Sequence, residues 1–280
     1  MSLSRRLRRL AFGLATLAGR PRGFFIPYRY ASGVDVPGHD AYPEIGGLLD
    51  AARPRFADCL NALEAHADAF ARIGSAPPPA PRWTQDWFPT PDAAVLYHMV
   101  ATLAPLRLVE VGSGHSTRFA MAAVADGALA TRITAIDPAP RADIAALPLT
   151  LLRTTVQQVD DAPFAALRPG DILSIDSSHI LMPGTDVDRL FARVLPALPA
   201  GVTVHIHDIF LPDGYPAGWA WRGYNEQNAV AALLAGGGWE ILWASHYAVT
   251  RMRDEVSASV IGRLPTVPGA QPAGLWLRKM

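Results

Sequence analysis

The sequence predicts an α/β protein built on a doubly wound, mostly parallel sheet of seven strands, with a helical appendage before it. Half of the 280 residues are hydrophobic and 18% are charged, so the chain can bury a core and is not disordered as a whole. From residue 105 onward, short apolar stretches alternate with amphipathic or alanine-rich ones, which is the pattern of βαβ units in a parallel sheet. A proline-rich stretch, residues 74–81, separates this region from the chain before it.

The N-terminal 30 residues are strongly basic. They carry seven arginines and no acidic residue, around a ten-residue apolar stretch, Leu10–Gly19. Three interpretations stay open. The segment is a secretory signal, an amphipathic helix that makes peripheral contact with an anionic membrane surface, or a basic helix packed on the protein's own domain.

A helix is predicted over Pro54–Ile73, because apolar side chains recur there at three- and four-residue spacing and proline suits a first turn. Gly74 can end this helix, and the proline-rich stretch that follows is the clearest boundary in the sequence. We therefore predict two parts, a helical N-terminal appendage with its linker over residues 1–82 and a sheet domain over residues 83–280.

The sheet domain begins with an aromatic cluster, Trp83, Trp87 and Phe88, which either plugs the junction with the appendage or forms one wall of a substrate pocket. A helix follows over about 91–103. Later apolar stretches predict the seven strands: Arg107–Val111, Arg132–Asp137, Thr150–Thr154, Asp171–Asp176, Val202–His207, Glu240–Ala244 and Val256–Gly262.

Composition excludes several classes of protein. Basic and acidic residues balance at 25 each, which removes the positive charge expected of a nucleic-acid binder. A single cysteine, Cys59, excludes an internal disulfide and a cysteine-cluster metal site, and suits a reducing compartment such as the cytoplasm. No apolar run approaches the roughly 20 residues that span a bilayer. An enzyme or small-ligand binder remains, and its only lysine, Lys279, is too near the C-terminus to act as a central base.

The first strand ends in a glycine turn. Gly112 and Gly114 flank Ser113, and a helix follows, so backbone N–H groups there can approach a ligand closely. As a dinucleotide fingerprint the turn is incomplete, because Thr117 stands where a third glycine is expected. Glu110, an acid inside an apolar strand, is costly to bury without a partner, and a cationic ligand would provide one.

The second strand ends at Asp137, 23 residues after Gly114. An acid at this point can accept hydrogen bonds from both hydroxyls of a ribose. The glycine turn and Asp137 together predict a nucleoside-containing cofactor.

The fourth and fifth strands end in a group of acids and histidines. Asp176 closes one strand and His207 and Asp208 close the other, with His179 just beyond. Three interpretations stay open: Asp176, His207 and Asp208 hold Mg²⁺ or Mn²⁺, His207 or His179 is a general base oriented by Asp176 or Asp208, or the group is a structural network.

These motifs resemble class I S-adenosylmethionine-dependent methyltransferases, which have a Rossmann-like sheet. Segments 171–179 and 207–210, with Trp87-Phe88-Pro89 and Asn225-Glu226-Gln227, resemble the macrocin-type O-methyltransferase branch, and the resemblance covers roughly residues 83–262. It implies that Gly112, Ser113 and Gly114 face the methionine part of the cofactor and Asp137 the ribose. It also implies that Glu110 lies near the methionine amino group, and Val156 and Gln157 beside the adenine. His207 departs from that branch, which has an Asp-Asp pair after the fifth strand, and this departure argues against a Mg²⁺ site.

The predicted function is methyl transfer to a hydroxyl of a small molecule, such as a sugar, a phenol or a natural-product intermediate. Asp176, His179, His207 and Asp208 are the predicted catalytic residues. An aromatic segment, 210–227, is the predicted lid over the acceptor, which Trp221, Tyr224, Asn225 and Glu226 would contact. Three alternatives are a nicotinamide oxidoreductase on a similar sheet, a non-catalytic nucleotide-binding protein, and a hydrolase using Ser116, which Arg118 argues against because its elbow needs glycine there. A homo-oligomer is compatible with the sequence.

Overall fold

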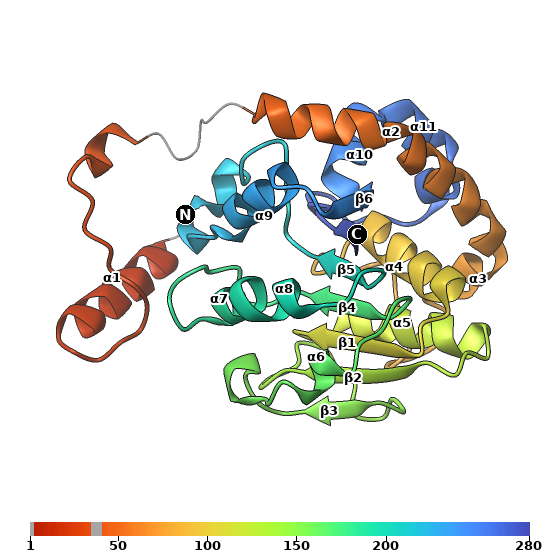
Figure 1. Cartoon of the computed structure of the whole chain (residues 1–280), viewed down its shortest axis with the longest axis horizontal. Helices are drawn as coiled ribbons and strands as arrows, with labels where there is room; N and C mark the ends of the chain where they lie inside the picture. Colours follow the sequence, from red (N-terminus) through yellow and green to blue (C-terminus); the bar gives the residue numbers. More distant parts are fainter. Residues whose placement is uncertain (1–2, 35–40) are drawn as a thin grey trace. The chain divides into compact units, whose positions relative to one another are not determined.

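The computed structural model of the chain describes residues 3–34 and 41–280 (Figure 1). It divides into two compact units, one of residues 1–40 with 214–223 and the other of residues 41–213 with 224–280. Residues 1–2 and 35–40 of the predicted appendage lie outside the described residues. None of the described helices has the length and apolar character needed to cross a bilayer.

The larger unit is built on a seven-stranded sheet with the order β3-β2-β1-β4-β5-β7-β6. The strands from β3 to β5 run parallel to one another, and β7 is antiparallel to both of its neighbours. The strands are β1 (Arg107–Val111), β2 (Arg132–Ile136), β3 (Thr150–Leu152), β4 (Ile172–Ile175), β5 (Thr203–Ile206), β6 (Trp239–Ala244) and β7 (Leu275–Lys279). The predicted fold class, an α/β protein with a doubly wound and mostly parallel sheet of seven strands, is confirmed.

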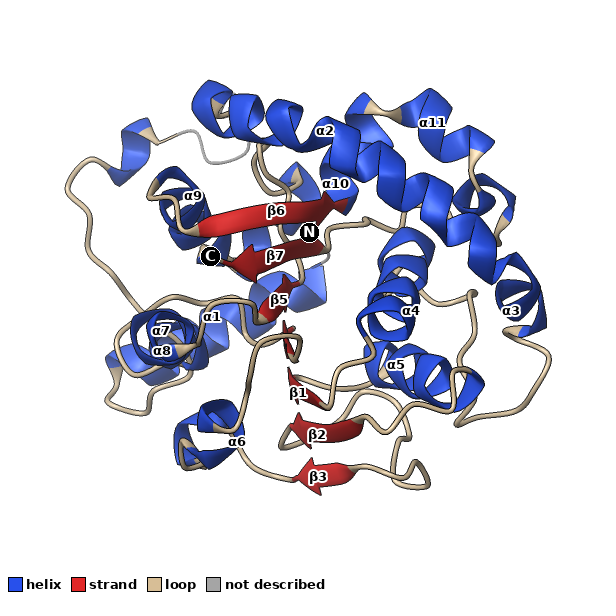
Figure 2. Ribbon diagram, turned by 45° about the vertical axis from the view of Figure 1, so that its right-hand side comes forward, coloured by secondary structure: helices blue, strands red, loops and turns tan. Residues whose placement is uncertain are grey.

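Helices cover both faces of this sheet (Figure 2). Helices α4 (Thr90–Leu103) and α5 (His115–Asp126) lie on one face, and α6 (Ala162–Ala165), α7 (Asp186–Arg189) and α8 (Leu195–Ala197) lie on the other. With both faces covered, β4 and β5 are buried along their whole length, as parallel strands generally are. The remaining helices of the unit are α2 (Pro43–Leu63), α3 (Ala67–Arg72), α9 (Glu226–Ala235), α10 (Ser245–Arg251) and α11 (Arg253–Ala258).

Helix α2 begins eleven residues before the predicted start at Pro54. Its first residue is Pro43, and Pro54 lies inside the helix, where the missing N–H removes one backbone hydrogen bond without ending it. Helix α2 packs on the sheet: Arg55 Nη1 donates to the carbonyl of Ile241 at 2.6 Å, and the rings of Phe56 and Trp243 meet edge to face. Residues 41–82 therefore belong to the compact unit of the sheet, in contrast to the predicted boundary at 82.

The last predicted strand, Val256–Gly262, is wrong. This stretch forms the end of α11 and a 3₁₀ helix, Val260–Arg263. Asp254 and Glu255 in the first turn of α11 favour a helix, and Ser259 caps the next one by accepting from the N–H of Ile261. The seventh strand is instead Leu275–Lys279, whose Trp276 is fully buried between β5 and β6.

Candidate active site

The glycine turn after β1 is held against the end of β4. Gly112 has a left-handed φ of 79°, and a Cβ added there would lie 1.7 Å from the carbonyl oxygen of Asp176. No other residue can make this approach without displacing one of the two backbones. Helix α5 begins directly after the turn at His115, and Thr117 Oγ1 accepts from the N–H of Gly114 at 2.9 Å. Thr117 thus replaces the missing third glycine with a hydrogen bond that closes the turn.

Glu110 is buried in β1, and both of its oxygens bind hydroxyl groups from the first turn of α5. Ser116 Oγ donates to one oxygen at 2.6 Å, and Thr117 Oγ1 donates to the other at 2.5 Å. Burial raises the pKa of Glu110 to about 7 against the opposing effect of these hydrogen bonds. Glu110 therefore ties the strand to the helix that follows the turn.

Asp137 lies directly after β2 and orders the same turn. Its Oδ2 accepts from both the N–H and the hydroxyl of Ser113, at 2.7 and 3.0 Å, and its Oδ1 accepts from the N–H of Ala139 at 2.7 Å. A carboxylate has about four acceptor positions, so Asp137 keeps capacity for a ribose hydroxyl. Beyond β3, the side chain of Val156 is buried and that of Gln157 is exposed.

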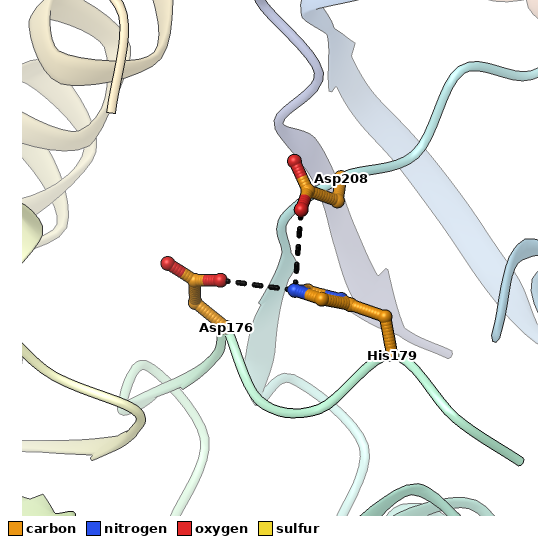
Figure 3. A group of neighbouring side chains, drawn as sticks. All are labelled: Asp176, His179 and Asp208. Carbon is orange, nitrogen blue, oxygen red and sulfur yellow. Dashed lines mark ion pairs between the residues drawn. The ribbon is translucent and has the colours of Figure 1, made fainter. Parts of the chain in front are cut away.

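The predicted acid and histidine group assembles at the ends of β4 and β5. The Nε2 atom of His179 lies 3.2 Å from Asp176 Oδ1 and 3.2 Å from Asp208 Oδ2, between the two carboxylates (Figure 3). His179 and Asp208 both have left-handed backbones, with φ of 60° and 59°. Non-glycine residues of this kind cost conformational energy and concentrate at functional sites.

Glu226, at the start of α9, completes the surroundings of His179. Its Oε2 lies 2.8 Å from His179 Nδ1, and its side chain is completely buried. Burial would lower the pKa of His179, but hydrogen bonds with Asp176 and Glu226 and the charge of Asp208 raise it well above its ordinary value. For Glu226 burial dominates and raises the pKa. His179 is therefore surrounded by three acids, Asp176, Asp208 and Glu226.

The second histidine, His207, faces a different acid. Its Nε2 lies 3.1 Å from Asp92 Oδ2, and its Nδ1 lies 3.6 Å from Asp176 Oδ1 and 3.5 Å from Asp208 Oδ1. Burial would lower the pKa of His207, but the charges of Asp176 and Asp208 raise it well above its ordinary value. Burial likewise would raise the pKa of Asp176, which His207 and His179 instead pull well below its usual range.

Asp92 is a site residue that sequence reasoning missed. It lies fully buried in the first turn of α4. Its carboxylate accepts hydrogen bonds from the backbone N–H groups of Ala273 and Gly274, at 3.0 and 2.9 Å, and it also contacts His207. The available signal was an acid directly before the continuous apolar run 93–97. A buried acid in such a run requires a partner, but the sequence does not say which.

The described atoms that could hold a metal ion are those of Asp176, His179 and Asp208, which lie within 4.8 Å of one another. The sequence instead paired Asp176 and Asp208 with His207. His207 presents its Nε2 to Asp92 and keeps its Nδ1 farther from both carboxylates than His179 Nε2. His179 is thus the better placed imidazole.

The four predicted acceptor contacts have different surroundings. The ring centroids of Tyr224 and His179 lie 4.6 Å apart. Asn225 exchanges hydrogen bonds with the backbone of Leu181, and Glu226 holds His179. Trp221 belongs to the other compact unit. Contact with an acceptor stays a prediction for all four.

Acid is expected to destabilise the protein through His205, on β5. Burial and the charge of His207 lower the pKa of His205 to about 3, whereas an unfolded histidine titrates near 6.5. The unfolded chain therefore binds this proton first as the pH falls from about 6.5 towards 3, and His205 by itself lowers the stability by about 2 kcal/mol by pH 5. Urea unfolding at pH 7 and pH 5 should show a smaller loss in His205→Gln than in the wild type. Equal losses would contradict this assignment.

Comparison with known proteins bears on the same region. Residues 109–209, from β1 through the end of β5, match the family model of a methyltransferase domain. This segment contains the glycine turn, Asp137 and the acid and histidine residues after β4 and β5. The comparison with curated proteins finds no match.

Several solved structures are similar to the chain. The SAH-bound methyltransferase PaMTH1 of Podospora anserina is 14% identical, with a TM-score of 0.42, over 92% of this chain and 99% of that one. A putative methyltransferase of Thermobifida fusca is 17% identical, with a TM-score of 0.40, over 80% and 93%. The cofactor-bound Rv0187 from MTB is 17% identical, with a TM-score of 0.39, over 86% and 98%.

The strand order of this chain and the family match of its central segment both agree with the predicted fold. The mostly parallel seven-stranded sheet, with β7 antiparallel between β5 and β6, is the Rossmann-like sheet that the sequence predicts. The macrocin-type branch stays a prediction. Residues 109–209 match a methyltransferase domain, and this match supports the predicted class I S-adenosylmethionine-dependent methyltransferase.

Proposed function

We propose that the protein is an S-adenosylmethionine-dependent methyltransferase, which transfers the methyl group of this cofactor to a hydroxyl oxygen of a small molecule, such as a sugar, a phenol or a natural-product intermediate. The main support is the close packing of the Gly112 turn on the backbone of Asp176, the first residue of the acid and histidine cluster. A cofactor over the turn and an acceptor at the cluster would be neighbours. The sulfonium supplies an already activated methyl group, so the chain has to orient the acceptor and accept its proton.

The turn residues fit the cofactor. Gly112, Ser113 and Gly114 combine a backbone that tolerates close approach with the N-terminal end of α5. Asp137 both orders Ser113 and retains acceptor capacity for a ribose hydroxyl. Glu110 acts behind the turn, where it would support the methionine end of the cofactor by holding Ser116 and Thr117.

Val156 and Gln157 are the proposed neighbours of the adenine. They belong to the 3₁₀ helix directly after β3, the strand that pairs with β2. Buried Val156 offers an apolar contact, and Gln157 offers an exposed amide that can form hydrogen bonds.

We further propose that the acids and histidine at the ends of β4 and β5 bind a divalent ion, with Asp176, His179 and Asp208 as its ligands. Glu226 binds His179 Nδ1, so the Nε2 lone pair of a neutral imidazole would point at the two carboxylates, a common second-sphere arrangement at metal sites. Oxygen and imidazole donors suit Mg²⁺ or Mn²⁺. The ion would lower the pKa of an acceptor hydroxyl.

The metal-free alternative makes a histidine the general base. The neighbouring carboxylates raise the pKa values of both His179 and His207, which stabilises the protonated form of each imidazole against its use as a base. These raised pKa values favour a metal ion over a free histidine as the group that activates the acceptor hydroxyl. Glu226 Oε1, buried and without a hydrogen-bond partner among the described residues, offers a further acceptor for a hydroxyl of the substrate.

Manganese binding tests the ion directly. Electron paramagnetic resonance should show Mn²⁺ bound to the wild-type protein and not to Asp176→Asn, whereas a control change of the exposed acid Asp254 to Asn should keep binding. Chelation should then abolish methyl transfer. If the wild-type protein binds no Mn²⁺ and EDTA leaves activity intact, the histidines handle the acceptor proton without a metal.

Calorimetry and product analysis test the function as a whole. S-adenosylmethionine and S-adenosylhomocysteine should bind, whereas NADH should not, which separates methyl transfer from a nicotinamide-dependent reaction. Incubation with panels of sugars and phenols should yield a product with a new O-methyl group by mass spectrometry and NMR. Binding of NADH alone would favour the oxidoreductase alternative, and cofactor binding with methylation only at nitrogen or carbon would contradict the proposed acceptor.

Asp92 is proposed as the positioning residue of His207, because it is held by two backbone N–H groups and cannot turn away. In Asp92→Asn, an amide NH₂ would have to face a donor of Ala273, Gly274 or His207. The expected result is a loss of about 3–5 kcal/mol of stability and a lower kcat with an unchanged affinity for S-adenosylhomocysteine. Urea unfolding and single-turnover kinetics measure the two effects. A stable variant of normal kcat would remove Asp92 from the site.

A further inference from the structure

Helix α1 (Leu3–Leu17) presents a row of leucines to solvent. Leu3, Leu7, Leu10, Leu14 and Leu17 follow one another at four- and three-residue spacing, which places them on one side of the helix. Their exposed fractions lie between 58% and 72%. A helix with such a face is stable only when something apolar covers it.

The chain that follows α1 continues this apolar surface. The side chains of Phe24, Phe25, Ile26, Tyr28 and Tyr30 are each exposed by 58–66%. Aromatic residues with one polar end favour the boundary between water and lipid. Residues 3–30 are called here the basic segment.

The charge of the basic segment has one sign. Arginines stand at positions 5, 6, 8, 9, 20, 22 and 29, and the first acidic residue of the chain is Asp35. In the described part of the chain, no carboxylate pairs with Arg6, Arg8, Arg9, Arg20, Arg22 or Arg29. A cationic surface beside an apolar one is complementary to anionic lipid, which offers negative headgroups above an apolar interior.

We propose that the basic segment binds the surface of a bilayer containing anionic phospholipids, with the leucine row inserted and the arginines at the headgroups. The 15-residue helix is about 22 Å long, shorter than the roughly 30 Å hydrocarbon core, so it lies in the plane of the surface. A second copy of the chain is a poorer occupant, because pairing two leucine rows would bring two sets of arginines together with no acid between them.

Sedimentation of the full-length protein with vesicles tests this proposal. The protein should partition to vesicles of phosphatidylcholine with phosphatidylglycerol, should partition weakly to phosphatidylcholine alone, and should be released by high salt. Arg8→Gln/Arg9→Gln should lower partition about thirtyfold, the effect of two charges at an anionic surface. Leu7→Gln/Leu14→Gln should lower it about tenfold or more with the charge unchanged.

A matched control removes two arginines elsewhere. Arg132 and Arg253 are exposed on the larger unit, and Arg132→Gln/Arg253→Gln should partition like the wild type. Circular dichroism and binding of S-adenosylhomocysteine verify that each variant is folded, and the latter also separates this test from that of the proposed function.

Three outcomes would overturn the proposal. They are no binding to anionic vesicles, equal binding to both kinds of vesicle at any salt concentration, and equal losses in the control and the Arg8/Arg9 variant. Analytical ultracentrifugation without lipid should show no self-association that the leucine substitutions abolish. If it does show this, the leucine row is an interface between copies.

Discussion

Replacing Gly112 with alanine is expected to weaken the binding of S-adenosylmethionine strongly. The new Cβ would stand 1.7 Å from the carbonyl oxygen of Asp176, and the residue has a φ of 79°. Overpacking costs about 1–3 kcal/mol, and a left-handed alanine costs about 1–2 kcal/mol more. The turn must therefore move away from Asp176, and calorimetry should show affinity for S-adenosylmethionine and S-adenosylhomocysteine reduced by about a hundredfold or more.

Gly170 provides the matched control for this variant. It also has a left-handed φ, of 89°, but an added Cβ would meet nothing within 4 Å. Gly170→Ala therefore has the conformational strain of a left-handed alanine without a steric clash of the added Cβ. It should lose a modest amount of stability and bind the cofactor normally. If Gly112→Ala binds as tightly as Gly170→Ala, the cofactor does not lie over this turn.

Replacing Asp208 with asparagine is expected to lower the rate of methyl transfer by about 10²–10⁴-fold, the usual contribution of a group that assists proton transfer. Asparagine has the same shape and tolerates the left-handed φ of 59° at this position, so the backbone should keep its conformation. The amide cannot supply the negative charge that faces His179 Nε2 at 3.2 Å. Single-turnover kinetics with an identified acceptor measure the effect.

Two controls make this result specific to the cluster. Affinity for S-adenosylhomocysteine should be unchanged, because the glycine turn packs against the backbone of Asp176. Asp254→Asn, a change at an exposed acid of α11, should retain full activity. A normal rate in Asp208→Asn would show that the acids after β4 and β5 hold the fold together rather than act on the acceptor.

The central sheet could be predicted because its strands are local features. Strands β1, β2, β4 and β5 are short apolar runs that end in polar residues, and the structure begins and ends them within one or two residues of the predicted bounds. The seventh strand was missed because Leu275–Lys279 carries two basic residues and follows a long irregular stretch. Its strand character depends on β5 and β6, which it joins on both sides.

The partners within the cluster could not be predicted. Asp92 lies 115 residues before His207 in the chain, and Glu226 lies 47 residues after His179. Asp92 precedes an apolar run, whereas Glu226 stands between Asn225 and Gln227. The cost of burying either acid requires a partner without indicating which one. The choice of His179 over His207 as the imidazole nearest Asp176 and Asp208 likewise depends on how the chain turns after β4.

The amino-acid sequence by itself determined the alternating strands and helices, the glycine turn and the polar residues at the strand ends, because periodicity, backbone freedom and chain order are local properties. The tertiary structure decided which acid meets which histidine, the close approach of Gly112 to Asp176, and the place of helix α2 on the sheet. These depend on side chains far apart in the chain meeting in a buried region, where hydrogen bonding and desolvation, rather than local propensity, select the contacts.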